Sequence, residues 1–151
     1  MMNYLLSLLI ILLAMTQCQR DETLPTPQGG GLGEAFVLEQ GERIKITGGE
    51  TNLMEMEVEE VADSRCPEDV VCVWYGNAVA KLKIYSNSGN SQALTFCIGD
   101  CRPAPFQSKH TLITEVGGKK YEITLLEVIP FPNTKQKTEN KQVKLLVNKA
   151  N

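Results

Sequence analysis

After Gly33, the hydrophobic pattern of this chain has a period of two, and this period restricts the possible folds more than any other feature. In the segment 54–59, methionine and valine alternate with glutamate. The segments 43–47 and 78–85 show the same alternation of aliphatic residues with mostly polar ones. Successive side chains of a β-strand point to opposite faces, so this pattern predicts strands with one buried and one solvated face.

The remaining segments complete an all-β prediction. Gly117-Gly118 separates two strand-like runs, as in a two-residue hairpin, and Asn87–Asn90 has the composition of a turn. Residues 130–141 form a polar loop with two prolines. Strands repeat at a spacing of about 8–12 residues, which predicts a single antiparallel β-sandwich of about 7–9 short strands, with a partly open β-barrel as the alternative. The expected strands are 35–39, 43–47, 54–59, 70–75, 78–85, 92–97, 111–116, 120–129 and 142–148.

The N-terminal segment is typical of an export signal. Tyr4 to Met15 is apolar except for Ser7. As a helix, this segment would span about 18 Å, well short of the ~30 Å hydrocarbon core, so it fits a signal-peptide core better than a membrane span. Cys18 follows shortly afterwards and resembles the lipidated cysteine of bacterial lipoproteins, although Gln17 replaces the usual small residue and the first four residues carry no Lys or Arg.

These features predict three parts: a lipoprotein signal peptide (1–17), a lipidated Cys18 with a Pro/Gly tether (18–33) and a β-sandwich domain (34–151). Relaxed lipoboxes of this kind resemble those of Bacteroidetes, in which an acidic stretch like Gln19–Glu22 resembles a surface-export signal. The expected location is the cell envelope, as an outer-membrane-anchored lipoprotein that faces the periplasm or the surface. Acyl chains on Cys18 would make the membrane itself a permanent partner. The alternative is a plain secretory signal that is cleaved nearby.

Four cysteines remain after Cys18, and an even number in an exported chain favours disulfides. Three pairings of Cys66, Cys72, Cys97 and Cys101 are possible. The local pairs Cys66–Cys72 and Cys97–Cys101 are favoured because each pair shares one loop region, whereas crossed pairs would tie distant strands together. The spacing matches neither the usual zinc knuckles nor a C-x-x-C redox motif, so we expect no metal and no cofactor.

The most distinctive motif begins at Asp63-Ser64-Arg65-Cys66-Pro67 and continues through Val71-Cys72 to Trp74, Gly76 and Ala78. Arg65 is expected to pair with Asp63 or to cap backbone carbonyls, and Gly76 to supply a bulge or a close backbone approach. The motif has two interpretations. In one, it is a structural corner with a buried Trp74; in the other, it is a binding loop that uses Asp63, Arg65, Trp74 and Tyr75.

This motif resembles a signature of small exported bacterial lipoproteins of Bacteroidetes type, whose function is unassigned. The stretch Tyr121–Pro132 is similar to a strand and loop near the C-terminus of the same group, and the resemblance covers roughly Phe36 to Val147. It implies a β-sandwich-like domain and a Cys66–Cys72 bond, and it implies no activity.

Composition and motifs argue against several classes of function. A formal net charge of −3 gives no polybasic signature for nucleic acid. Residues 21–72 hold 13 acidic and 3 basic residues, whereas residues 73–151 hold 5 acidic and 11 basic residues; we expect these charges to neutralise one another on neighbouring strands. His110 is the only histidine, and the chain has no nucleophile elbow, zinc-protease helix or phosphate-binding loop. We therefore expect no enzymatic activity.

Two functional hypotheses remain. The first is a non-catalytic binding module for a protein or glycan ligand, with contacts from loops near 66–72, 97–105 and 130–141. The second is a structural or accessory envelope protein, such as an inhibitor or assembly subunit. A remote third is a metal-binding or hydrolytic protein that uses carboxylate pairs such as Glu59/Glu60 or Glu68/Asp69. An exposed aromatic side chain at Trp74 or Tyr75 would favour sugar stacking within the first hypothesis, and complete burial would count against it. We expect Trp74 to be buried.

Overall fold

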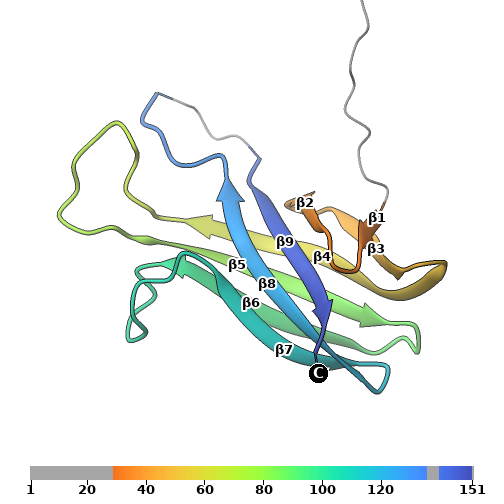
Figure 1. Cartoon of the computed structure of the whole chain (residues 1–151). Helices are drawn as coiled ribbons and strands as arrows, with labels where there is room; N and C mark the ends of the chain where they lie inside the picture. The colour runs from red at the N-terminus through yellow and green to blue at the C-terminus, as the bar shows by residue number, and fades with distance from the viewer. Residues whose placement is uncertain (1–28, 136–139, 151) are drawn as a thin grey trace, which may run out of the picture.

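The computed structural model describes residues 29–135 and 140–150, and these residues form nine strands and no helix. Two sheets pack face to face and do not close into a barrel within the described residues (Figure 1). The predicted antiparallel sandwich is therefore confirmed, with one short parallel pair added. The predicted signal peptide and the predicted lipid on Cys18 concern residues outside the described ranges. Nothing in the described part is a helix long and apolar enough to cross a membrane.

The first sheet has five strands in the order β1-β3-β4-β5-β6. Its long central pair, β4 with β5, is antiparallel and runs from Met54 opposite Ser86 to Asp63 opposite Ala78. The strands are β1 (Gly29–Gly31), β3 (Arg43–Gly48), β4 (Thr51–Asp63), β5 (Asn77–Ser86) and β6 (Ser91–Gly99).

The second sheet has four antiparallel strands in the order β2-β9-β8-β7. β7 and β8 are joined through Gly117-Gly118, which confirms the predicted hairpin. The strands are β2 (Ala35–Glu39), β7 (His110–Val116), β8 (Lys119–Ile129) and β9 (Gln142–Lys149).

The core lies between the inner faces of the two sheets and follows the alternation in the sequence. Met54, Met56 and Val58 of β4 are completely buried, and Leu82 of β5 lies among them. On the other sheet, Leu125 is equally buried. Burying a side chain of this size contributes about 1.5–3 kcal/mol, so the period of two directly selects the face that is removed from water.

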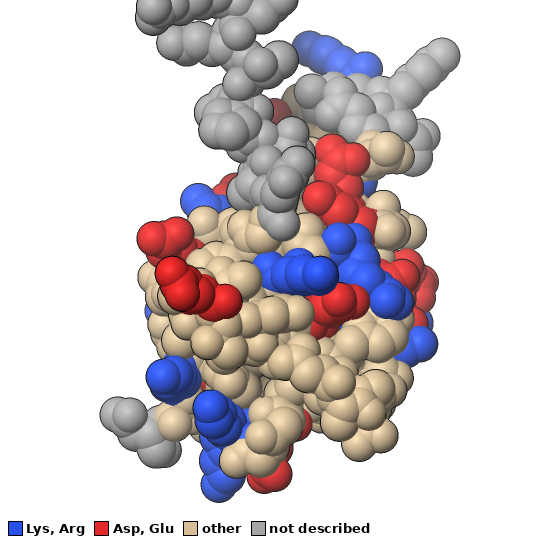
Figure 2. Space-filling model, turned by 90° about the vertical axis from the view of Figure 1, so that its right-hand side faces the viewer, with Lys and Arg blue, Asp and Glu red and all other residues tan. Residues whose placement is uncertain are grey.

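The outer face of β4 explains the uneven charge distribution. Its glutamates face basic residues of β3 and β5: Arg43 lies 2.8 Å from Glu57, and Lys81 lies 2.6 Å from Glu60. The Tyr85 hydroxyl and Arg43 donate hydrogen bonds to Glu57 and lower its pKa. Acidic and basic side chains also lie next to one another on the side of the molecule that Figure 2 shows. The two charge-biased halves of the sequence thus neutralise each other in the folded sheet.

Strand β1 lies within the range 18–33 that the sequence analysis assigned to a tether. Gly30 pairs with Ile46 in a parallel register, and a Cβ on Gly30 would lie 2.7 Å from the Phe36 ring. The bare glycine backbone is therefore what fits between β3 and the core. The described sheet therefore extends back at least to Gly29, a few residues before the predicted boundary at residue 34.

One predicted strand is wrong. Residues 70–75 are rich in β-branched and aromatic side chains, which favoured a strand. However, Asp63 at the end of β4 pairs directly with Ala78 near the start of β5, so the residues between them must form the connection. In the structure, Val70–Tyr75 is an exposed loop that is closed by a disulfide.

Candidate functional site

The candidate site is one end of the sandwich, where three long connections meet. We call this region the loop end; it comprises the described residues of 64–76, 100–109 and 130–141, and it lies on the left side of Figure 1. The opposite end, which we call the turn end, carries the short turns at 49–50, 87–90 and 117–118. The three loops predicted from the sequence as ligand contacts therefore lie together.

Two disulfides close the connections of the loop end. Cys66 is bonded to Cys72 with a Cα–Cα separation of 5.9 Å, and Cys97 to Cys101 with 6.0 Å. The local pairing favoured from the sequence is confirmed. Neither bond links the two sheets, so both act on the shape of the loops.

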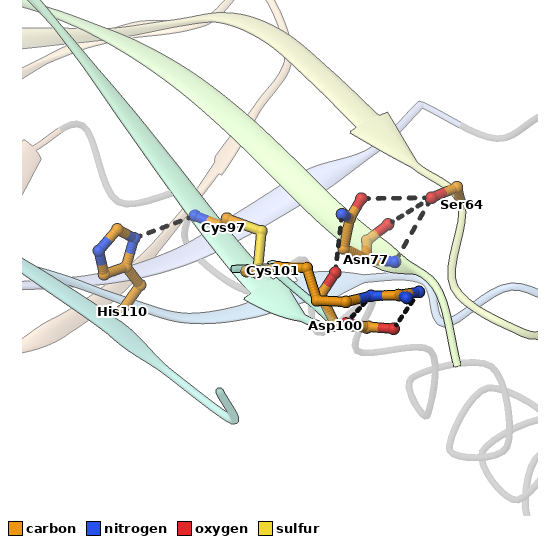
Figure 3. Close-up of a disulfide and its surroundings, with 7 residues drawn as sticks. Ser64, Asn77, Cys97, Asp100, Cys101 and His110 are labelled. Carbon is orange, nitrogen blue, oxygen red and sulfur yellow. Dashed lines mark hydrogen bonds and ion pairs between the residues drawn. A yellow bond between two sulfur atoms is a disulfide. The ribbon is translucent and has the colours of Figure 1, made fainter. Parts of the chain in front are cut away.

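Asn77 joins the first loop to the second. The Ser64 hydroxyl donates to the Asn77 carbonyl (3.0 Å), and the Asn77 side-chain amide donates to the Asp100 carbonyl (3.0 Å). Figure 3 shows Asn77 between these two residues, beside the Cys97–Cys101 disulfide. The Asp100 amide also donates to the Gly76 carbonyl (2.8 Å), so the two loops are held as one unit.

Gly76 permits the close backbone approach that the sequence suggested. Its φ is +67°, and a Cβ built on it would lie 1.9 Å from the Ser64 carbonyl oxygen. No side chain larger than hydrogen fits at this position without moving backbone. The Cys66 amide donates to the Tyr75 carbonyl (2.8 Å) immediately beside this contact.

Asp63 is the centre of a buried ionic network. Its side chain is 1% exposed and accepts hydrogen bonds from the Arg65 guanidinium (2.7 and 2.8 Å) and from the Lys141 ammonium (3.1 Å). Burial opposes ionisation of Asp63, but the hydrogen bonds and charge of Arg65, together with the hydrogen bond from Lys141, outweigh burial and lower the pKa of the carboxyl.

The same network connects the two sheets. Arg65 donates to the Val128 carbonyl (2.7 Å) and stacks over the Phe131 ring, with 4.3 Å from the guanidinium carbon to the ring centroid. Lys141 donates to the Pro130 carbonyl (2.8 Å). Arg65 therefore fulfils both roles expected of it, and the Cys66–Cys72 loop is fixed to the loop that follows β8.

A second set of contacts holds the acidic tip of the Cys66–Cys72 loop. Asp69 accepts hydrogen bonds from the amide (3.0 Å) and the hydroxyl of Thr134, which lower its pKa. Glu68 accepts from the Asn133 amide (3.0 Å). This carboxylate pair, considered above as a hydrolytic or calcium site, is instead used to bind one loop to the other.

Seven large apolar side chains remain exposed on this rigid frame. Val71 and Val73 are fully exposed, and Trp74 is 67% exposed. The expectation that Trp74 is buried is wrong, because the disulfide-closed loop projects beyond the ends of the strands and offers no core position. We call the set the apolar patch: Val70, Val71, Val73, Trp74, Tyr75, Phe106 and Phe131.

An apolar pocket of about 220 Å³ lies within the patch. Tyr75, Phe106 and Phe131 form its aromatic walls, with Ile98 and Cys66 also among its lining residues. Tyr75 and Phe106 meet edge to face, with ring centroids 5.8 Å apart. Arg65 lines the pocket, but Asp63 already neutralises its charge. The pocket therefore suits an apolar group.

A larger hollow of about 460 Å³ lies at the turn end, between the β5–β6 and β7–β8 hairpins. Serine, asparagine and glycine residues of the turns form most of its walls, and Glu115 is its only titratable lining residue. It has no aromatic wall. Its size therefore reflects the gap between two hairpin turns rather than a shaped site.

The histidine and the carboxylate pairs singled out in the sequence are engaged in other contacts in the described residues. The described residues contain no group of three or more His, Cys, Asp or Glu side chains that could hold a metal. His110 Nδ1 accepts a hydrogen bond from the Cys97 amide (3.1 Å), which gives this histidine a structural partner. Glu59 and Glu60 face Lys83 and Lys81 on the outer sheet face.

The four residues predicted for the binding loop do not share one role. Asp63 and Arg65 form the supporting network, whereas Trp74 and Tyr75 are presented to solvent. The predicted loop ranges contain Phe131 in 130–141 but end one residue before Phe106, at position 105. An aromatic residue inside the proline-rich run Pro103–Phe106 is the signal that could have identified it.

Comparisons of the chain with protein-family models, with curated proteins and with solved structures find no match. The function is therefore inferred from the geometry of the loop end.

Proposed function

We propose that this protein is a non-catalytic binding module of the cell envelope that holds its ligand at the loop end. The observation that carries the proposal is the apolar patch, in which Val71, Val73 and Trp74 are exposed on a frame of two disulfides and a buried ionic network. A protein gains no folding energy from apolar side chains that stay in water. Contiguous exposed apolar patches of several hundred Å² often mark interaction sites.

The rigidity of the frame supports the same proposal. A surface that is already ordered loses little conformational entropy when it binds, so more of the contact energy appears as affinity. Aromatic side chains in such a position are the usual anchors of an interface.

The proposed location is the envelope, with lipid on Cys18 as the membrane anchor. The two disulfides are the feature of the described residues that supports an oxidising compartment. We expect mass spectrometry of the envelope-purified protein to find an acylated Cys18 at the N-terminus, and a Cys18→Ala variant to be lost from the membrane fraction. An unmodified N-terminus elsewhere would favour simple secretion.

Photo-crosslinking in the native envelope tests the binding function. A benzophenone amino acid replaces Val73 in the full chain, and a matched variant carries it at Ile113, which is 65% exposed on β7 away from the loops. We expect a discrete adduct from position 73 and none from position 113. Equal labelling at both positions, or no adduct at 73, would contradict the proposal.

A further inference from the structure

The apolar patch combines a depression with projecting side chains. It contains a depression, the 220 Å³ pocket walled by Tyr75, Phe106 and Phe131, and it contains projecting side chains, Val71, Val73 and Trp74, which do not line that pocket. Trp74 directly precedes Tyr75 in the chain, so the projecting and hollow parts adjoin each other. An engineered cavity of about 150 Å³ accepts benzene, so a pocket of 220 Å³ is large enough for an apolar side chain.

We propose that the ligand of the loop end is a second copy of this chain. The inference rests on the proposed function and names its partner. In a two-fold dimer, each patch faces an identical patch, and the projecting loop of each copy fills the pocket of the other. Each pocket is then completed by residues of the partner copy.

The exposed area fits this occupant. Trp74, Tyr75, Phe106 and Phe131 are 67%, 74%, 63% and 45% exposed. With about 150–250 Å² for a whole aromatic side chain, these four expose roughly 400–600 Å², and the fully exposed Val71 and Val73 add to this. A stable interface needs about 800 Å² from each partner, so two copies of one patch approach the area of a standard interface.

The charges beside the pocket fit the same arrangement. On one side, the Cys66–Cys72 loop carries Glu68 and Asp69. On the other side, Arg102 is ion-paired with Asp100 at 2.9 Å, so Lys109 supplies the net positive charge of the loop that contains Phe106. A two-fold axis through the pocket region places the acidic loop of each copy against the basic loop of the other, so no like charges need to meet.

The first described residue, Gly29, lies far from the patch. Gly29 pairs with Lys45, which lies opposite Glu55 near the start of β4. The loop end begins after Asp63, eight residues farther along β4 than Glu55, which is about 27 Å at strand spacing. Gly29 is therefore separated from the patch by most of the length of β4.

The test uses two differently tagged copies of the full chain, expressed together in the native envelope, with the photo-crosslinker at position 73 of one copy. We expect an adduct that carries both tags, with the crosslink located on residues 104–108 of the other copy. Position 113 serves as the control and should give no such adduct.

A charge exchange provides a second, independent readout. Glu68→Lys should reduce the doubly tagged adduct roughly threefold to fivefold, as expected for the loss of a rim ion pair, and so should Lys109→Glu. Glu68→Lys combined with Lys109→Glu should restore the adduct, because the two residues of each pair then carry opposite charges again.

Two outcomes would overturn the proposal. An adduct from position 73 that contains a different protein, a glycan or lipid would leave the binding function intact but exclude the second copy as its ligand. The absence of any adduct at position 73 would contradict both proposals.

Discussion

The two ends of the sandwich connect their strands by different means. At the turn end, the hairpins close in a few residues, and positive φ values fall on glycines such as Gly89 and Gly117. At the loop end, the connections are long and need two disulfides, a buried ion-pair network and a close backbone approach at Gly76. The loop end therefore uses covalent, ionic and close-packing contacts to fix connections that the turn end makes with a few turn residues.

The largest difference between the ends should follow the loss of glycine. Gly76→Ala places a Cβ 1.9 Å from the Ser64 carbonyl oxygen, whereas Gly89→Ala at the turn end meets nothing within 4 Å. We expect Gly76→Ala to lower the free energy of unfolding by about 4 kcal/mol or more, and Gly89→Ala by about 1 kcal/mol. Urea denaturation followed by circular dichroism measures both. Equal losses of unfolding free energy in the two variants would show that the close backbone approach at Gly76 contributes little to stability.

A somewhat smaller effect is expected from Asp63→Asn. This change leaves the Arg65 and Lys141 charges without their carboxylate, which should cost about 3 kcal/mol. Glu57→Gln is the matched change on the exposed ion-pair face, where we expect only a small loss that decreases further in salt.

The pH dependence of Asp63→Asn provides a separate check. The pKa of Asp63 is lower in the folded protein than in the unfolded chain. The carboxylate therefore contributes fully to the free energy of unfolding above the unfolded pKa of about 3.9, and this contribution is lost as the pH falls through the pKa of the folded protein. The difference in unfolding free energy between wild type and Asp63→Asn should therefore narrow in acid. A difference that stays constant down to pH 2 would contradict the assigned role of the carboxylate.

Removal of the disulfides should have an intermediate effect. Cys66→Ser with Cys72→Ser, and Cys97→Ser with Cys101→Ser, each open a short ring and should cost about 2 kcal/mol in urea denaturation. Losses much larger than this would mean that the disulfides hold the sheets together rather than shape the loops.

The smallest effect on stability is expected within the apolar patch itself. Val73→Ser should change the free energy of unfolding by no more than about 0.5 kcal/mol, because the side chain is fully exposed. Leu82→Ala in the core is the contrasting change and should cost about 2–5 kcal/mol. A clear loss of stability in Val73→Ser would mean that the patch packs within the domain, and it would weaken the proposed binding role.

Most of the strands could be predicted from the sequence because the alternation reports directly on the buried face. The segment 35–39 matches β2 in full, and 78–85 lies within β5 (Asn77–Ser86). The prediction failed for 70–75, where β propensity described side chains that meet no neighbouring strand. It also missed β1, because three glycines carry no hydrophobic pattern, and their position depends on pairing with β3 and on the close approach of Phe36.

The candidate site could be predicted only in part. The cysteine pairs and the Asp63–Arg65 contact involve residues close together in the sequence, so the sequence was enough to suggest them. Lys141 and Phe131 reach the site from the other sheet, and only the packing of the two sheets brings them there. The exposure of Trp74 likewise depends on how far the loop projects beyond the strands, which spacing alone does not indicate.

Strand β1 gives the domain a defined mechanical response. In a chain anchored through Cys18, tension would enter at Gly29 and act first on the short β1–β3 pairing, then on the bond from the Gly33 amide to the Val147 carbonyl (2.8 Å). Detachment of Gly29–Gly31 would lengthen the tether by about 10 Å while the two main sheets stayed paired. Under tension, the triglycine strand would thus detach before the strands that carry the binding surface separate.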